Sequence, residues 1–421
     1  MRQLIPVCAV VLSITACSSD PSDGGGAGGS SSATAGASAT GGRPSSTGGA
    51  SGVAGSQSTG GGGAGTAGGP SGNTGGAAPT AGSPSTGGSP GAGGGGTSNA
   101  GAGVGGAGAG GGPVVGTGGS GPAATFKCDN LTLAPTTTGV AKPAGAAGGL
   151  KVVDWAGFKG AASFTFDDNT PSQLQNYTAL KATGGHFTWF LIASSSSNDY
   201  KATIADGQEI ANHTQTHPGS ASQGEVTTAQ TNLKTKYGVD VRSMAAPNCA
   251  DAWAAFAAPA KLFQNRGPCG GGIATVSPRD NTDPLKLPAW LPAMNEPAAT
   301  MSGAITMGKW RIFVIHGFDS QNGTYQPVKI ADTTSAMSKA VTDGYWVEGM
   351  TNVGAYWQGQ KLIPASATTS ATWTLPANFP PNMCVRITTT GGTVTQKNET
   401  INWDSHGYYQ ISLDAGEVTI K

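Results

Sequence analysis

The feature that most constrains this chain is a short apolar strand that ends in two adjacent carboxylates. In residues 163–166 two phenylalanines alternate with Ser and Thr, and Asp167 and Asp168 follow directly. Alternation of this kind is typical of a half-buried strand, on which neighbouring side chains point to opposite faces. The two acids can therefore do different work. Two carboxylates at the end of a buried strand are costly without a charged partner, so we expect one between them.

A pair of histidines supplies ligands that match these acids. His213 and His217 are four residues apart, so on a helical turn both side chains would lie on one face and could share a metal ion. One aspartate and two histidines leave coordination positions open for water and substrate. The pattern predicts an open site for a divalent metal ion.

Strand and helix patterns alternate in the second half of the chain. The sequence predicts strands at 163–166, 186–192, 239–246 and 311–315, and helices at 172–182, 225–237, 253–263, 330–342 and 353–358. This alternation over about 200 residues implies a parallel sheet or an α/β barrel. Asp167, Asp168 and His316 each stand at the carboxyl end of a predicted strand, which favours a barrel because catalytic groups gather at that end.

The N-terminus resembles a bacterial lipoprotein signal. Arg2 precedes a short apolar run, and small residues lead to Cys17, so residues 1–17 would be a signal whose Cys17 becomes lipidated. An ordinary secretory signal is the alternative. Either one places the mature chain outside the cytoplasm, and the lipidated form would be anchored to a membrane, with the outer membrane or cell surface favoured. No run of 18 or more apolar residues predicts a transmembrane helix.

Residues 18–122 consist almost entirely of Gly, Ser, Thr, Ala and Pro. Such a segment cannot bury enough apolar surface to offset the entropy of ordering, so we predict a disordered tether. The whole chain has 23 basic and 23 acidic residues, and this zero net charge gives no indication of nucleic acid as a partner. We expect a monomer.

Two ordered regions are predicted after the tether, a catalytic domain at 123–359 and a small β domain at 360–421. The second region has short alternating runs separated by Gly-containing turns, which predicts a small antiparallel sandwich. Four of its aromatic residues could stack on sugar rings, although aromatic residues in so small a domain usually form its core; they are Trp373, Trp403, Tyr408 and Tyr409.

Four cysteines follow the tether, and an even number outside the cytoplasm suggests disulfides. Cys249 with Cys269 would close a short loop, and Cys128 with Cys384 would connect the start of the ordered region to its C-terminal part. Four cysteines allow three pairings, and free buried thiols are the other alternative. The spacing lacks the Cys-x-x-Cys pattern of a zinc site.

Several short motifs together resemble the polysaccharide deacetylases, the NodB-like carbohydrate esterases. The motifs are Thr-Phe-Asp-Asp at 165–168, His-x-x-x-His at 213–217, Ala-Pro at 246–247, Gln-Asn-Arg-Gly at 264–267 and Val-Ile-His at 314–316. The resemblance covers about residues 148–358 and implies a distorted (β/α) barrel. It also implies metal-dependent removal of acetyl groups from a polysaccharide, usually from N-acetylglucosamine units. Asn169 stands where this family commonly has Gly, and Ala246 where it often has Arg.

The resemblance assigns roles to individual residues. Asp168, His213 and His217 would hold one divalent ion, most plausibly Zn²⁺ with Co²⁺ as the alternative. Asp167 would be the general base and His316 the general acid. The backbone N–H of Asn248, directly after Pro247, would stabilise the oxyanion. Arg266 would orient the base, or else pair with a surface acid.

Three functions remain open at this point. The first is removal of N-acetyl groups from an extracytoplasmic polysaccharide, and the second is an O-acetyl esterase acting on xylan or an exopolysaccharide. The third is a non-catalytic, polysaccharide-binding surface lipoprotein that retains the fold. The presence of all five residues of the implied acid, base and metal set favours an enzyme.

Overall fold

The structure is a computed structural model that describes residues 126–195, 198–270, 274–319 and 323–421. The predicted signal, the lipidated Cys17 and the tether at 18–122 lie outside these residues. In the described ranges, no helix has both the length and the apolar character needed to cross a membrane.

The strand that ends in the two carboxylates is one of seven parallel strands that close into a barrel. In ring order they are β2 (Ala161–Asp167), β3 (Thr188–Leu191), β4 (Glu209–Asn212), β5 (Ser243–Ala245), β6 (Gln264–Gly270), β7 (Leu287–Trp290) and β8 (Trp310–Ile315). Strand β2 pairs with both β3 and β8, which closes the ring, and β9 (Trp346–Val347) adds to the start of β2. The predicted distorted (β/α) barrel is confirmed.

Strand β2 is buried on both faces, so the expectation of a half-buried strand was wrong. All seven of its residues are buried. Phe164 and Phe166 belong to a core cluster that includes residues of α7, and Phe164 stacks on Phe313 of β8 with ring centroids 4.4 Å apart. The alternate residues Thr165 and Asp167 hydrogen-bond inside the barrel instead. Successive side chains of β2 therefore point in turn to an apolar layer outside the barrel and to its polar interior, and neither face of the strand meets solvent.

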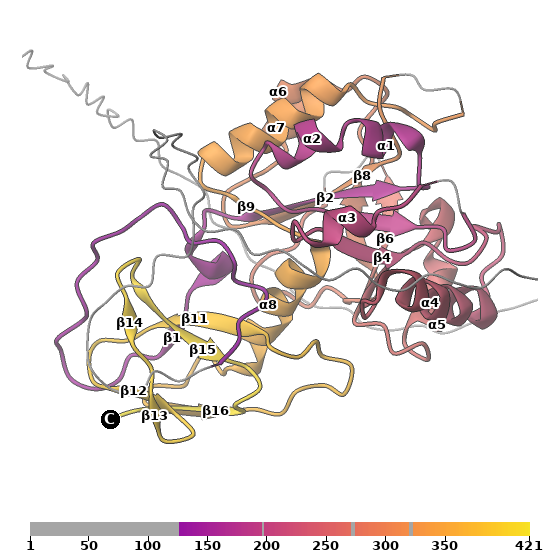
Figure 1. The fold of residues 1–421 in the computed structure, drawn as a ribbon. Coiled ribbons are helices and arrows are strands. Elements are labelled where there is room, and N and C mark those ends of the chain that lie inside the picture. The colour runs from indigo at the N-terminus through magenta and orange to yellow at the C-terminus, as the bar shows by residue number, and fades with distance from the viewer. Residues whose placement is uncertain (1–125, 196–197, 271–273, 320–322) are drawn as a thin grey trace, which may run out of the picture. The chain divides into compact units, whose positions relative to one another are not determined.

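Helices line the outside of the barrel, and Figure 1 shows α1, α2 and α7 along one side of the strands and α4 and α5 along the other. Their bounds are α1 (Pro171–Gln175), α2 (Tyr177–Lys181), α3 (Lys201–Ile204), α4 (Gln223–Tyr237), α5 (Ala254–Ala257), α6 (Ala298–Gly303), α7 (Ile330–Thr342) and α8 (Met350–Leu362). Helix α4 begins at the capping residue Ser222, whose side chain accepts the Glu225 N–H, and ends at Gly238 with a φ of 72°.

Two of the predicted helices are shorter than expected. The helix at 172–182 is divided into α1 and α2 by Asn176, whose φ of −103° and ψ of 8° are not helical. The helix at 253–263 is limited to a 3₁₀ turn at Asp251–Trp253 and the four residues of α5. Pro259 explains the early end, because it has no backbone N–H to donate to the carbonyl four residues before it, although Ala258 itself keeps helical φ and ψ values of −63° and −49°.

Two four-stranded antiparallel sheets follow the barrel, as predicted for the C-terminal region. One contains β1 (Lys151–Val152), β11 (Cys384–Thr388), β15 (Tyr408–Ser412) and β14 (Trp403–Asp404). The other contains β10 (Ser370–Thr372), β16 (Glu417–Ile420), β12 (Val394–Gln396) and β13 (Glu399–Thr400). Strand β1 precedes the barrel in sequence but pairs with β11. The domain limits at 123–359 and 360–421 stay a prediction.

The aromatic residues of these sheets mainly form their core. Tyr408 and Tyr409 are buried, and Trp373 and Trp403 are half-buried. Trp403 packs edge-on against Tyr409 at 5.0 Å and donates its indole N–H to the Val140 carbonyl. The core interpretation of these residues therefore fits better than a row of exposed sugar-stacking rings.

Both predicted disulfides are confirmed. Cys128 is bonded to Cys384, and Cys249 is bonded to Cys269. The first connects the start of the described chain to β11 and encloses the barrel sequence between its ends. The second connects the loop after β5 to the end of β6.

Candidate metal centre and active site

The backbone turns sharply where β2 ends, and this turn separates the two carboxylates. Asp167 is the last residue of the strand, while Asp168 and Asn169 have φ values of 71° and 54° in the left-handed region. Asn tolerates this region better than most residues. The Asn169 side chain accepts the Ile192 N–H at 2.7 Å, which fastens the turn to the end of β3.

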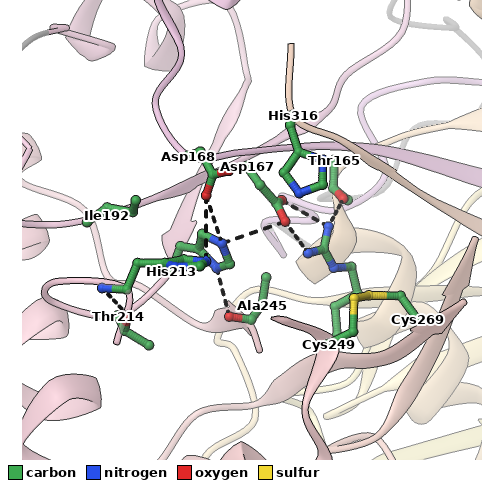
Figure 2. Close-up of polar contacts among 12 residues, drawn as sticks. Thr165, Asp167, Asp168, Ile192, His213, Thr214, Ala245, Cys249, Cys269 and His316 are labelled. Atoms are coloured by element: carbon green, nitrogen blue, oxygen red, sulfur yellow. Dashed lines mark hydrogen bonds and ion pairs between the residues drawn. A yellow bond between two sulfur atoms is a disulfide. The ribbon is translucent and has the colours of Figure 1, made fainter. Parts of the chain in front are cut away.

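Three side chains converge into a group that could hold a metal ion. One ligand atom each from Asp168, His213 and His217 lies within 4.8 Å of the other two. Oδ1 of Asp168 is 3.3 Å from Nε2 of His213 and 3.7 Å from Nε2 of His217. Figure 2 shows Asp168 and His213 facing each other, with Asp167 and His316 beside them.

The two histidines do not lie on a helical turn, and this expectation was wrong. They stand on the loop that follows β4, where Thr214 and His217 have φ values of 67° and 56°. Local side chains stabilise the loop: Asn212 Oδ1 accepts the Thr214 N–H at 2.7 Å, and the Thr214 hydroxyl accepts the His217 N–H at 3.1 Å. A loop with two such bends brings residues four apart together just as a helical turn would.

The donor atoms of this group fit a divalent transition metal. Nδ1 of His213 lies 2.9 Å from the Ala245 carbonyl and can donate its proton there, which leaves the Nε2 lone pair facing Asp168. Asp168 Oδ1 is buried and has no well-aligned hydrogen-bond donor in the described chain. One carboxylate oxygen and two imidazole nitrogens, with an acceptor left unsatisfied between them, are the set that Zn²⁺ sites use.

Electrostatics keep Asp168 ionised. Burial alone would raise its pKa, but the close contact with His213 at 3.3 Å and the charges of His213, His316 and His217 outweigh burial and lower the pKa to about 2. Burial is also the largest influence on His217, and it lowers the pKa of that side chain. Burial would lower the pKa of His213 as well, but Asp167 and Asp168 outweigh it and raise the pKa of that ring. Metal binding would therefore release a proton from His213, because a histidine binds a metal ion as the neutral imidazole.

Asp167 is held by a buried arginine rather than by the metal group. Nη1 of Arg266 donates to Oδ1 of Asp167 at 2.9 Å, and Nη2 donates to Oδ2. Nη1 also donates to the Thr165 hydroxyl at 2.6 Å, and the guanidinium lies over the Phe190 ring. Arg266 and Asp167 are 1% and 2% exposed, so the alternative of a surface ion pair is wrong.

His316 stands directly after β8, on the same side of the barrel mouth as the two carboxylates. The Thr170 hydroxyl and the Gln173 amide both donate to its carbonyl, at 2.6 and 2.9 Å. Its ring Nδ1 is buried without a hydrogen-bond partner among the described residues. Burial lowers the pKa of His316, and the charges of Asp167 and Asp168 act against that effect.

The Pro247 loop borders the group on the β5 side. Pro247–Cys249 forms a short 3₁₀ turn in which Asn248 has a φ of 54°. This turn follows Ala245, whose carbonyl contacts His213, and the disulfide from Cys249 ties it to β6. The predicted oxyanion residues therefore lie on a loop next to the metal group.

Some residues that shape the site were not recognised as such from the sequence. The Thr165 hydroxyl contacts Arg266, and its position two residues before Asp167 on the same strand face was an available signal. Gln173 donates to the carbonyls of both Asp167 and His316. The Ala245 carbonyl that orients His213 has no side-chain signal at all, because any residue supplies the same group.

Comparison with known proteins agrees with this geometry. Residues 157–255 match the family described as polysaccharide deacetylase. A gellan lyase from a Bacillus species is 33% identical over 111 residues, which are 24% of this chain and only 4% of that protein.

Solved structures are similar to about half of the chain, and two of them serve as examples. The Xyl-CE4 domain of a multidomain xylanase from the hindgut metagenome of Trinervitermes trinervoides is 16% identical with a TM-score of 0.34, over 47% of this chain and 89% of that one. A peptidoglycan deacetylase from Bacillus subtilis is 18% identical with a TM-score of 0.31, over 48% of this chain and 92% of that protein's chain. These values are too low to transfer either activity to this chain.

The matched segment contains Asp167, the three residues of the metal group and the Pro247 loop, all at the carboxyl ends of barrel strands. This part of the chain, residues 157–255, is therefore similar to polysaccharide deacetylase domains in its sequence.

Proposed function

We propose that this protein removes acetyl groups from an extracytoplasmic polysaccharide, most plausibly the N-acetyl groups of N-acetylglucosamine units. One observation carries the proposal: a metal-binding group, an arginine-held carboxylate and a half-buried histidine meet at one barrel mouth. These groups supply a candidate for each role in amide hydrolysis, namely the metal site, the general base and the general acid. The anchored, outer-membrane or cell-surface location that we expect for the chain would bring this site to polymer outside the cell.

The proposed chemistry divides the work between the two aspartates. Asp168, His213 and His217 would hold Zn²⁺, or Co²⁺ in its place, and the bound ion would supply positive charge next to the acetyl carbonyl. Asp167 would take a proton from the water that attacks the carbonyl carbon, while Arg266 holds both carboxylate oxygens in place.

His316 and the Pro247 loop would complete the reaction. His316 would give a proton to the departing nitrogen as the carbon–nitrogen bond breaks, so the products are acetate and a free amine. The Asn248 backbone N–H would stabilise the oxyanion. Burial lowers the pKa of His316, so the ring gives up a proton more readily than a free histidine would, and the charges of Asp167 and Asp168 act against this effect.

The two carboxylates can be tested separately in the full chain. Asp168→Ala removes a ligand, so metal content by elemental analysis and acetate release should fall together. Asp167→Asn keeps the shape and the ligand set but cannot accept a proton. It should keep its metal and lose activity by about 10²–10⁴-fold. Asp343→Asn, on a side chain that is 40% exposed, is the matched control and should change neither quantity.

Substrate choice and the enzyme assignment are tested in the same assay. Acetate release is compared on N-acetylglucosamine oligomers, peptidoglycan and acetylated xylan, and preference for acetylated xylan would favour the O-acetyl esterase. A wild-type protein that binds metal and polysaccharide without releasing acetate would instead be a binding protein. Full activity in Asp167→Asn would refute the proposed role of Asp167 as the base.

A further inference from the structure

One exposed aromatic side chain lies beside the proposed acid. Four large hydrophobic side chains of the described chain are exposed, namely Val140, Met294, Met307 and Tyr325. Tyr325 is the aromatic member of this set and is 60% exposed. Its ring stands perpendicular to the ring of His316, with the two centroids 5.3 Å apart. An exposed ring in this position needs an explanation that the proposed chemistry does not give.

The backbone around Tyr325 is fastened at the base of its loop. Phe318 and Val328 form a bridge across the loop. The Asp319 N–H donates to the Val328 carbonyl at 2.9 Å, and the Val328 N–H donates to the Gly317 carbonyl at 3.1 Å. These contacts hold Val328, three residues after Tyr325, against residues 317–319 directly after His316, so the backbone on that side of Tyr325 is anchored next to His316.

A second loop adds apolar surface beside it. The Asn295 N–H donates to the Pro327 carbonyl at 3.0 Å, which joins the loop after β7 to the loop of Tyr325. Met294, next to this contact, is 61% exposed. The side-chain amide of Gln326 lies 3.4 Å from the Tyr325 hydroxyl. An exposed ring, a thioether and an amide thus flank one side of the barrel mouth.

We propose that Tyr325 is a sugar-stacking residue that binds the sugar unit adjacent to the one being deacetylated. This inference rests on the proposed function. Sugar rings present faces of C–H groups edged by hydroxyls, and a tyrosine ring offers an apolar face with a polar tip to match them. The contact with His316 puts this face within one sugar unit of the reaction. The interaction would therefore add affinity for a polymer and would leave the chemical step largely unchanged.

The experiment compares three variants on the hexamer of N-acetylglucosamine and on acetylated xylohexaose. Tyr325→Ala should raise KM about tenfold for whichever hexamer the enzyme deacetylates, and should keep kcat within about twofold. The reason is that a contact made equally to the substrate and to the transition state affects KM and not kcat. Tyr325→Phe keeps the ring and should stay close to wild type. Met307→Ala is the matched control, because Met307 is 71% exposed but precedes β8 at the opposite end of the barrel.

Calorimetry separates this inference from the proposed function. Hexamer binding is measured in an Asp167→Asn background, with and without Tyr325→Ala, so it requires no turnover. If wild-type protein releases no acetate, the proposed function fails, while weaker binding on loss of Tyr325 would still support the stacking role. Three results would each overturn the stacking role of Tyr325: unchanged affinity for the hexamer, no hexamer binding at all, or a fall in kcat with constant KM. A fall in kcat alone would mean that Tyr325 acts through His316.

Discussion

Replacing Arg266 by Met should destabilise the protein strongly, because it leaves a buried carboxylate without its partner. Arg266 donates to Asp167 twice and to Thr165 once, and both charged groups are almost fully buried. Removing one partner of such a buried pair typically costs about 3–5 kcal/mol of stability, since the remaining charge cannot be solvated. The apolar stem of Met can still pack against Phe190, so the cost should come mainly from the charge.

The chain contains a matched control for this change. Arg242 pairs with Asp240 at 3.1 Å, but these side chains are 28% and 53% exposed. Surface ion pairs contribute about 0–1 kcal/mol, so Arg242→Met should change stability by no more than that. The same substitution at two arginines therefore isolates the effect of burying the pair.

Urea unfolding followed by circular dichroism, with the disulfides kept intact, measures both variants. A double variant with Asp167→Asn should recover part of the loss, which would show as a coupling free energy of about 1–3 kcal/mol. Arg266→Met should also keep its metal, because the ligand residues are untouched, and lose acetate release. The reasoning is refuted if Arg266→Met costs no more than Arg242→Met, or if the double variant is destabilised by the simple sum of its two changes.

Two further outcomes concern stability away from the site. Replacing both Cys128 and Cys384 by Ala opens a loop that spans 256 residues of sequence. In the entropy model this should destabilise the chain by about 5 kcal/mol. Thermal unfolding measures the loss, and an unchanged unfolding midpoint would contradict the prediction. The hydrogen bond that the His186 ring donates to Glu348 raises the pKa of His186 despite burial, so the stabilisation from this pair is complete below the ordinary pKa of 6.5 and is lost as pH rises through the higher folded-state value. The stability difference between wild type and His186→Gln should therefore be larger at pH 6 than at pH 9, and a constant difference would count against the pair.

The barrel could be predicted because its main signals are local. Alternation at 163–166 and the apolar run at 311–315 identified β2 and β8, and the carboxyl ends of parallel strands meet at one rim. That geometry alone brings Asp167, Asp168 and His316 together. The four-residue spacing identified His213 and His217 as candidate ligands, and the motif resemblance supplied the Pro247 turn and Arg266.

Strands β6 and β7 could not be predicted for a physical reason. Strand β6 has the sequence Gln-Asn-Arg-Gly-Pro-Cys-Gly, and β7 has a proline in its second position. Their composition is polar or strand-breaking, yet four residues of β6 are fully buried. Polar side chains are stable there because they hydrogen-bond inside the barrel, and this interior exists only after the ring has closed. Hydrophobic periodicity cannot report an environment of that kind.

The backbone of the site is held in a conformation that would be unfavourable without the rest of the fold. Non-glycine residues with left-handed φ values gather where the site loops leave their strands; they are Asp168, Asn169, Thr214, His217, Asn248 and Cys249. Such residues cost of order 1–3 kcal/mol each unless the surroundings impose the conformation. Here each loop has its own restraint, a side-chain amide after β2, side-chain oxygens after β4 and a disulfide after β5. Because these restraints come from the protein's own atoms, they favour the arrangement in which the side chains that they carry are gathered at the barrel mouth.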